Sequence, residues 1–168
     1  TGATLARAHV AWNGSRWLVT WDGPGGVFAR RLGADLALLD VAPIVVMPGS
    51  VNDVAAQGDT FLVTALVPEA NPEFIDVRSR RLSAATGALL DPASVLAGAT
   101  YATAQAVLAY EGGFLLAWER HTTHDQPMSS INLRLISAAN VPGAQTTFTS
   151  TSAYNQVPAL PAGDGGGV

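Results

Sequence analysis

The segment that decides the fold is VAWNGSRWLVTW, residues 10–21, because closely similar segments return twice along the chain. The second copy reads VAAQGDTFLVTA, residues 54–65, and the third reads LAYEGGFLLAW, residues 108–118. Trp17 and Phe61 are 44 positions apart and Phe61 and Phe114 are 53 apart, so the period is near 50 residues. A period of this size indicates one supersecondary unit that is used several times.

Each copy predicts four short β-strands. In the first copy we expect them at Ala8–Trp12, Trp17–Trp21, Val27–Leu32 and Ile44–Met47. The Asn13-Gly14 pair between the first two strands is a strong hairpin signal. In the second strand Trp17, Val19 and Trp21 share one face, Leu18 and Thr20 share the other, and neither face carries a charge. We therefore expect this strand to be covered on both faces.

Small four-stranded sheets stacked face to face meet this requirement, and they are the blades of a β-propeller. We predict an all-β, β-propeller-like array of four-stranded blades, in which three blades are followed by the start of a fourth. The single repeat domain, residues 1–168, divides into blades at 4–51, 52–101 and 102–152, and 153–168 supplies the first strand of an incomplete blade. The alternative is a β-trefoil, which closes with three four-stranded repeats.

The repeat also resembles a known family. The pattern V-A-[WY]-x-G-x-x-[WF]-L-V-x-W is followed by an Arg-Leu pair at 31–32, 81–82 and 134–135, and then by Leu-Leu-Asp at 38–40 and 89–91. It resembles the repeats of secreted and surface bacterial β-propeller proteins of the myxobacterial type. The resemblance implies a secreted or cell-surface protein. Its matching positions are packing residues, so it implies no particular ligand.

Composition excludes several classes of function. The 168 residues include no cysteine, which excludes a disulfide framework and a thiolate metal site. The net charge is −4, so no basic face for nucleic acid can be assembled. No apolar run is long enough to span a membrane as a helix. No phosphate-binding loop or dinucleotide fingerprint occurs, so we expect no cofactor.

The arginines Arg31, Arg81 and Arg134 precede a leucine in each copy. Such residues can bind an anionic ligand, or they can cap carbonyl groups and pair with Asp40 and Asp91. Recurrence in every copy favours the structural role. A strand-end histidine, His9, is likewise expected to be a packing or capping residue.

Candidate ligand-binding residues lie where the copies differ most, in the connections from second to third strand at 22–26, 67–74 and 119–129. The longest connection combines charged, imidazole, amide and thioether groups, which are Glu119, His121, His124, Asp125, Gln126 and Met128. Its two histidines and one aspartate leave metal binding open, because a third or fourth ligand is needed.

The first functional hypothesis is therefore an extracellular or surface binding and adhesion scaffold for a glycan or protein ligand. The alternatives are a glycan hydrolase or lyase that uses carboxylates such as Asp22 and Glu119, and a structural blade array within a larger assembly. No catalytic residue is assigned. The open ends of the array require a cover, which is the rest of a parent chain, another copy or another subunit.

Overall fold

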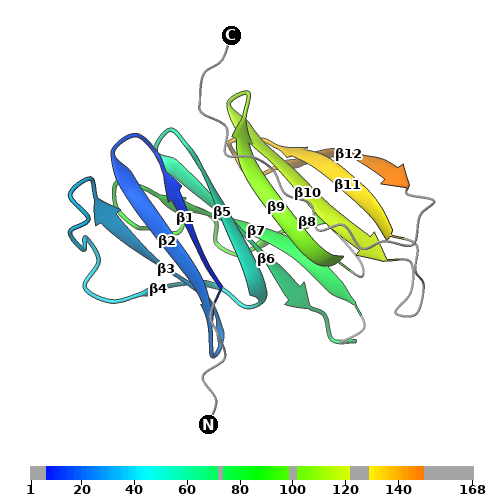
Figure 1. Ribbon diagram of the computed structural model, residues 1–168, viewed down its shortest axis with the longest axis horizontal. Coiled ribbons are helices and arrows are strands. Elements are labelled where there is room, and N and C mark those ends of the chain that lie inside the picture. The colour runs from blue at the N-terminus through cyan, green and yellow to red at the C-terminus, as the bar shows by residue number, and fades with distance from the viewer. Residues whose placement is uncertain (1–6, 72–73, 99–101, 122–128, 150–168) are drawn as a thin grey trace.

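The protein consists of β-strands stacked in three separate sheets (Figure 1). The computed structural model describes residues 7–71, 74–98, 102–121 and 129–149. The first sheet contains β1 (Ala8–Trp12), β2 (Arg16–Gly23), β3 (Gly26–Gly33) and β4 (Ile44–Met47). The second contains β5 (Ser50–Gln57), β6 (Thr60–Pro68), β7 (Ile75–Ser83) and β8 (Val95–Gly98). The third contains β9 (Ala102–Tyr110), β10 (Gly113–His121), β11 (Ser129–Ile136) and β12 (Pro142–Thr149).

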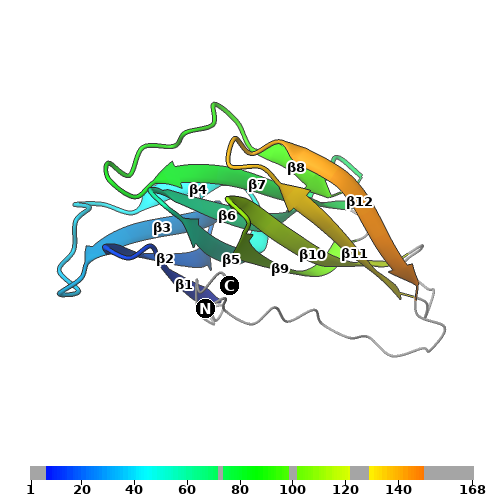
Figure 2. The ribbon, with the colours of Figure 1, turned by 90° about the horizontal axis from the view of Figure 1, so that it is seen from above.

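Each sheet is an antiparallel meander whose strands lie in chain order. The hydrogen-bonded ladders stay within each sheet, so the arrangement is the blade array and not the trefoil alternative. Along one side of the stack the first strand β5 contacts the first strands β1 and β9, and the fourth strands lie on the other side (Figure 2). In the part of the chain that the structure describes, no helix is long and apolar enough to cross a bilayer.

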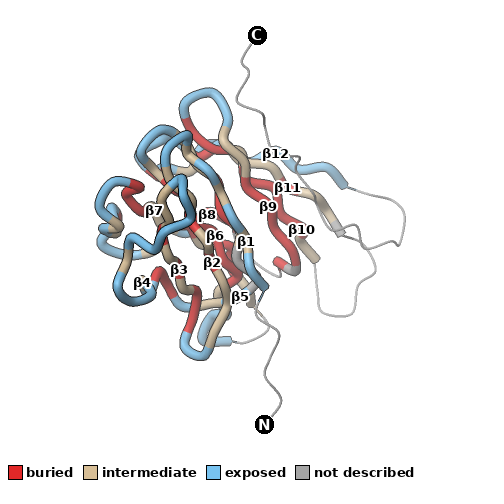
Figure 3. Tube along the Cα trace, turned by 60° about the vertical axis from the view of Figure 1, so that its left-hand side comes forward, coloured by how far each residue is buried: buried red, intermediate tan, exposed pale blue. Residues whose placement is uncertain are grey.

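The second sheet is buried on both faces (Figure 3), whereas β2 of the first sheet, for which the sequence predicted cover on both faces, is fully buried only on the face of Leu18 and Thr20. Phe61 and Val63 of β6 pack against the first sheet in one hydrophobic core. Leu62 and Leu66 of the same strand pack against the third sheet in a second core. Because side chains alternate along a strand, one apolar run supplies both cores.

We call the face of each sheet that carries Trp17, Phe61 or Phe114 its front face, and the opposite face its back face. These three residues hold corresponding positions, because they pair across the hairpin ladder with Leu32, Leu82 and Ile136. Phe61 and Phe114 are fully buried against the preceding sheet. Trp17 is only half-buried, because the described residues place no sheet in front of the first.

The third copy departs from the sequence alignment by one residue. The Arg-Leu pairs predicted Leu135 to match Leu32 and Leu82, but the buried partner of Phe114 is Ile136, and Leu135 is 51% exposed. Arg134 consequently matches Arg30 and Arg80 rather than Arg31 and Arg81. A shift of one residue moves a side chain to the other face of its sheet, so Arg134 lies on the front face and Leu135 on the back face.

One set of arginines reaches from a front face to the preceding sheet. Arg80 donates from Nη1 to the Val46 carbonyl in β4, at 2.7 Å. Arg134 donates from Nη1 to the Ala97 carbonyl in β8, at 2.8 Å. Val46 and Ala97 are equivalent, since each lies in a bulge of its fourth strand. Arg30 holds the same register position in the first sheet, and we call Arg30, Arg80 and Arg134 the backward arginines.

A second set reaches from a back face to the following sheet. Arg31 forms an ion pair with Asp40, at 2.6 Å, and donates to the Ala84 carbonyl of the second sheet, at 3.0 Å. Arg81 repeats this with Asp91, at 2.7 Å, and with the Ala138 carbonyl of the third sheet, at 2.9 Å. For these two residues, which we call the forward arginines, the structural role is confirmed. Leu135 occupies the equivalent position in the third sheet.

The turn that receives a forward arginine is shaped to fit it. Gly87 has a φ of 77°, and a Cβ added there would lie 2.8 Å from Nε of Arg31. In the third sheet Asn140 has a φ of 60° and donates from its amide to Asp91, at 2.8 Å. Glycine and asparagine are the residues that tolerate this backbone conformation most readily.

Both carboxylates of these pairs are held in the charged form. Burial alone would raise the pKa of Asp40, but the hydrogen bonds and charge of Arg31 outweigh it and lower the pKa below its ordinary value. The pKa of Asp91 is also lowered, because Arg81 and Asn140 outweigh the effect of its burial. Each pair therefore stabilises the contact between two neighbouring sheets.

Truncation of the front-face aromatics tests the packing. Phe114→Ala should lower the free energy of unfolding by about 3–5 kcal/mol, because it leaves a cavity between two sheets. Trp17→Ala should cost only about 1–2 kcal/mol, since this ring is half-buried and loses less contact. Urea denaturation of both variants measures the difference. Equal losses would contradict the assignment of an occupied and an open front face.

Acidification tests the carboxylate pairs. A lowered folded-state pKa contributes stability that is present above the unfolded pKa, near 3.8, and is lost as the pH falls through the folded value. We expect the free energy of unfolding to fall steeply below about pH 4, and to fall less in Asp40→Asn and Asp91→Asn. Denaturant titrations across pH measure this, with Asp35→Asn in an exposed turn as the control.

Candidate functional site

Two of the predicted ligand-binding residues lie together near the end of β10. Glu119 is 2% exposed, and Nε2 of His121 lies 3.5 Å from its Oε1. The two side chains share the back face of the third sheet because they are two residues apart in a strand. The other four, His124, Asp125, Gln126 and Met128, lie outside the described residues.

The carboxylates of the hydrolase hypothesis belong to different sheets. Asp22 in β2 holds the position of Glu119 in β10, and the corresponding residue of the second sheet is Leu66. The whole second sheet lies between them (Figure 1). Within residues 7–71, 74–98, 102–121 and 129–149, no three His, Cys, Asp or Glu side chains are grouped to hold a metal ion.

Glu119 lies near the ends of the sheets where the second strand connects to the third, and these connections differ in length between the sheets. We call these ends of the sheets the variable edge. The connection from β2 to β3 has two residues, 24–25, and the connection from β6 to β7 has six, 69–74. The connection from β10 to β11 has seven, 122–128. The strands on either side of these connections pair in the same register in all three sheets. The sheets therefore differ in the length of this connection and agree in strand pairing.

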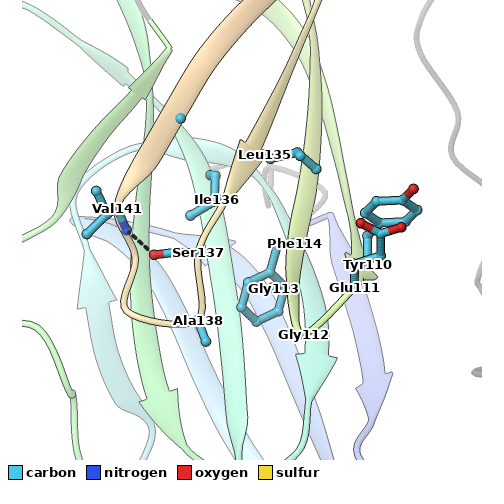
Figure 4. A pocket seen from close by; sticks show the side chains of 11 residues that line it. Tyr110, Glu111, Gly112, Gly113, Phe114, Leu135, Ile136, Ser137, Ala138 and Val141 are labelled. Atoms are coloured by element: carbon cyan, nitrogen blue, oxygen red, sulfur yellow. Dashed lines mark hydrogen bonds between the residues drawn. The ribbon is translucent and has the colours of Figure 1, made fainter.

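A groove lies at the opposite edge, in the third sheet. It has a volume of about 340 Å³ and runs between the β9–β10 hairpin and the turn from β11 to β12. Tyr110 and Glu111 stand together at one rim, Val141 stands at the other, and Phe114 lies between them (Figure 4). The sequence did not point to it, because the candidate residues were sought in the connections from second to third strand, at the opposite edge.

The corresponding hairpin and turn of the second sheet are joined by a hydrogen bond. There the Asp59 carbonyl, in the β5–β6 hairpin, accepts a hydrogen bond from the Ala84 amide, at 2.9 Å. By register Gly112 takes the place of Asp59 in the third sheet, and Ala138 takes the place of Ala84. Only the alignment of hairpin and turn together reveals this correspondence.

The groove offers an aromatic ring beside an anionic acceptor. Tyr110 is 43% exposed, and its hydrogen bond to Glu111, reinforced by the charge of that carboxylate, raises the pKa of the phenol above 10. Leu135 and Val141 supply exposed apolar surface. Binding sites commonly combine apolar and aromatic walls with a few polar groups in this way.

A third polar cluster joins the first strands of all three sheets. His9 in β1 lies 3.1 Å from Asp53 in β5, measured from Nδ1 to Oδ1. The other carboxylate oxygen of Asp53 accepts a hydrogen bond from the Val107 amide in β9, at 2.8 Å. Asp53 lies at a bulge in β5, which the sequence pattern did not reveal. This cluster is a structural link, and His9 takes part in it through the carboxylate of Asp53.

Comparison with known proteins supports the fold. No protein-family model matches the chain, and no curated protein matches it either. Among solved structures it is similar to the subtype N11 neuraminidase-like protein of A/flat-faced bat/Peru/033/2010 (H18N11), with a TM-score of 0.51 and 14% identity. The match covers 86% of this chain and 39% of that protein. The sheets are therefore blades of the β-propeller type, as the repeat predicted.

The first-strand cluster makes stability depend on pH near neutrality. The hydrogen bond to Asp53 raises the pKa of His9 above 6.5, against the opposing effect of burial. The stabilisation is therefore fully present below about pH 6.5 and is lost as the pH rises through the folded-state pKa. NMR titration should show a raised His9 pKa that returns toward 6.5 in Asp53→Asn. An unchanged value in that variant would contradict the link.

Proposed function

We propose that this protein is a secreted or cell-surface binding scaffold whose groove at Tyr110 and Glu111 takes a glycan. The observation that carries the proposal is the exposed tyrosine ring beside a carboxylate in an apolar groove. A sugar ring has an apolar C–H face that packs on an aromatic side chain. Its hydroxyl groups donate hydrogen bonds to a carboxylate, which accepts them strongly.

The frame around the groove supports a binding role. Phe114 and Ile136 line the groove and are buried in the core between the second and third sheets. Side chains held in a packed core keep their positions, so the groove needs little ordering when a ligand enters. Function carried by connections on a rigid repeated frame is a common arrangement.

The variable edge is a second candidate location for the same function. Glu119 and His121 form a polar pair there, beside the connection that contains His124, Asp125, Gln126 and Met128. This edge was favoured by sequence because its connections differ in length between copies. The experiment therefore has to distinguish the two edges of the third sheet.

Binding of the intact chain to a glycan array tests the proposal. Tyr110→Ala should weaken binding by about tenfold or more, as expected for an aromatic contact, and Glu111→Gln should weaken it less. Phe148→Ala is the matched control, because Phe148 is an exposed aromatic of the same sheet outside the groove. Melting temperatures should stay nearly constant, since exposed substitutions change stability by about 0.5 kcal/mol or less.

Other results would redirect or overturn the proposal. Loss of binding in His121→Ser/His124→Ser/Asp125→Ser, with Tyr110→Ala unaffected, would assign the ligand to the variable edge. Release of free sugar from a bound glycan, abolished in Glu119→Gln, would favour the hydrolase alternative. A chain that retains no glycan at all contradicts the glycan proposal and leaves a protein ligand or a structural role.

A further inference from the structure

The front face of the first sheet is an exposed apolar surface. It carries four aromatic rings, three valines and one leucine, which are Trp12, Trp17, Trp21, Phe28, Val10, Val19, Val45 and Leu32, together with one arginine, Arg30. The aromatic rings pair with each other, with centroids 4.8 Å apart for Trp12 and Trp17 and 6.1 Å apart for Trp21 and Phe28. We call this surface the open front face. Contiguous apolar surface of this kind marks an interaction site.

Corresponding positions in the other two sheets are buried by a neighbouring blade. Val10 is 58% exposed, whereas its equivalent Val54 is 6% exposed and packs against the first sheet. Trp21 is half-buried, whereas its equivalent Trp118 is fully buried against the second sheet. The open front face therefore has the same construction as two surfaces that bind a blade within this chain.

The polar groups of that interface are also present on the first sheet. Arg30 is a backward arginine, and it donates from Nη2 to the Val41 carbonyl of its own sheet, at 2.6 Å. In Arg80 and Arg134 the Nη1 group crosses to a bulged carbonyl of the preceding sheet. Nη1 of Arg30 is the donor that a preceding fourth strand would engage.

The first sheet also has the turn that receives a forward arginine. Leu36 has a φ of 64° and its amide bonds to the Gly33 carbonyl, as Gly87 bonds to Ser83 and Asn140 to Ser137. By this match the Ala34 carbonyl corresponds to the Ala84 and Ala138 carbonyls, which accept from Arg31 and Arg81. Ala34 is exposed.

We propose that the open front face binds a further propeller blade of the second-sheet type. That blade presents a bulged fourth strand, whose carbonyl accepts from Arg30, and a forward arginine paired with an aspartate, which donates to the Ala34 carbonyl. Both interfaces within the chain use these two contacts, one backward and one forward arginine, so a blade that supplies them matches the open front face.

A second copy of this chain fits the face less well. An open front face has Arg30 as a donor but no bulged carbonyl to accept from the Arg30 of another copy, because that of β4 bonds to the second sheet. The third sheet has Leu135 where a forward arginine is needed. Its fourth strand pairs Ile131 and Asn132 with Phe148 and Thr147 without the bulge that exposes the acceptor carbonyl.

A fusion protein tests the proposal. A second copy of Ser50–Gly98 is joined ahead of Leu5, so that residues 5–7 match the three residues, 99–101, between β8 and β9. Three of the four tryptophans lie on the open front face, and the fourth, Trp118, is fully buried. Quenching of tryptophan emission by acrylamide therefore reports on this face. We expect quenching to fall severalfold in the fusion relative to the original chain.

Variants of the arginine identify the contact. In the fusion, Arg30→Met should restore much of the quenching, because the equilibrium for blade docking falls by about tenfold when a charged hydrogen bond is lost. Arg16→Met is the matched control, since Arg16 belongs to the same sheet and alternation places its side chain on the back face. Protection that is unchanged in Arg30→Met would overturn the proposed contact.

A longer fusion and the self-association of the original chain test the same face independently. If the single added blade does not fold, a longer fusion that adds Ala8–Gly98 ahead of Leu5 supplies that blade with its own neighbour. Half of the front-face tryptophan emission should then be protected, and full quenching in the folded fusion would overturn the proposal. Sedimentation of the original chain should show no self-association, and acrylamide should quench its front-face tryptophans. A dimer that protects them would assign the face to a second copy instead.

Discussion

The structure depends on the contact between the back face of one blade and the front face of the next. Each contact combines a buried apolar core with two arginines that cross in opposite directions. The apolar core supplies most of the stabilisation, because Phe61, Leu62 and Phe114 are removed from water almost completely. The arginines fix the register, since each donates to one particular carbonyl of its neighbour.

The fold could be predicted from the pattern of apolar residues in the strands and from the repeat. Alternation of Trp17, Val19 and Trp21 with Leu18 and Thr20 requires cover on both faces, and a repeat near 50 residues requires identical units to provide it. Both constraints depend only on the residues of short segments and on the spacing between those segments, so they can be recognised from the sequence alone. The strands of the first copy accordingly lie within two residues of their predicted bounds.

The errors and omissions arise where two distant segments meet. The third Arg-Leu pair looks like the other two, but Leu135 faces outward and Ile136 inward, and only the ladder to Phe114 reveals this. Asp53 is significant because the first strands of three sheets converge on it. The groove beside Tyr110 lies between a hairpin and a turn, and no single segment of sequence shows that these two come together.

The arginine contacts give the array a polarity. The first and second blades each donate a forward arginine to the next blade, whereas the third blade has Leu135 in that place. In repeat proteins stability is close to a sum of each unit and its nearest-neighbour interfaces. The second blade has two complete interfaces and the outer blades have one each. Amide hydrogens of β6 should therefore exchange with solvent most slowly, and the two ends of the array should open first and at different rates.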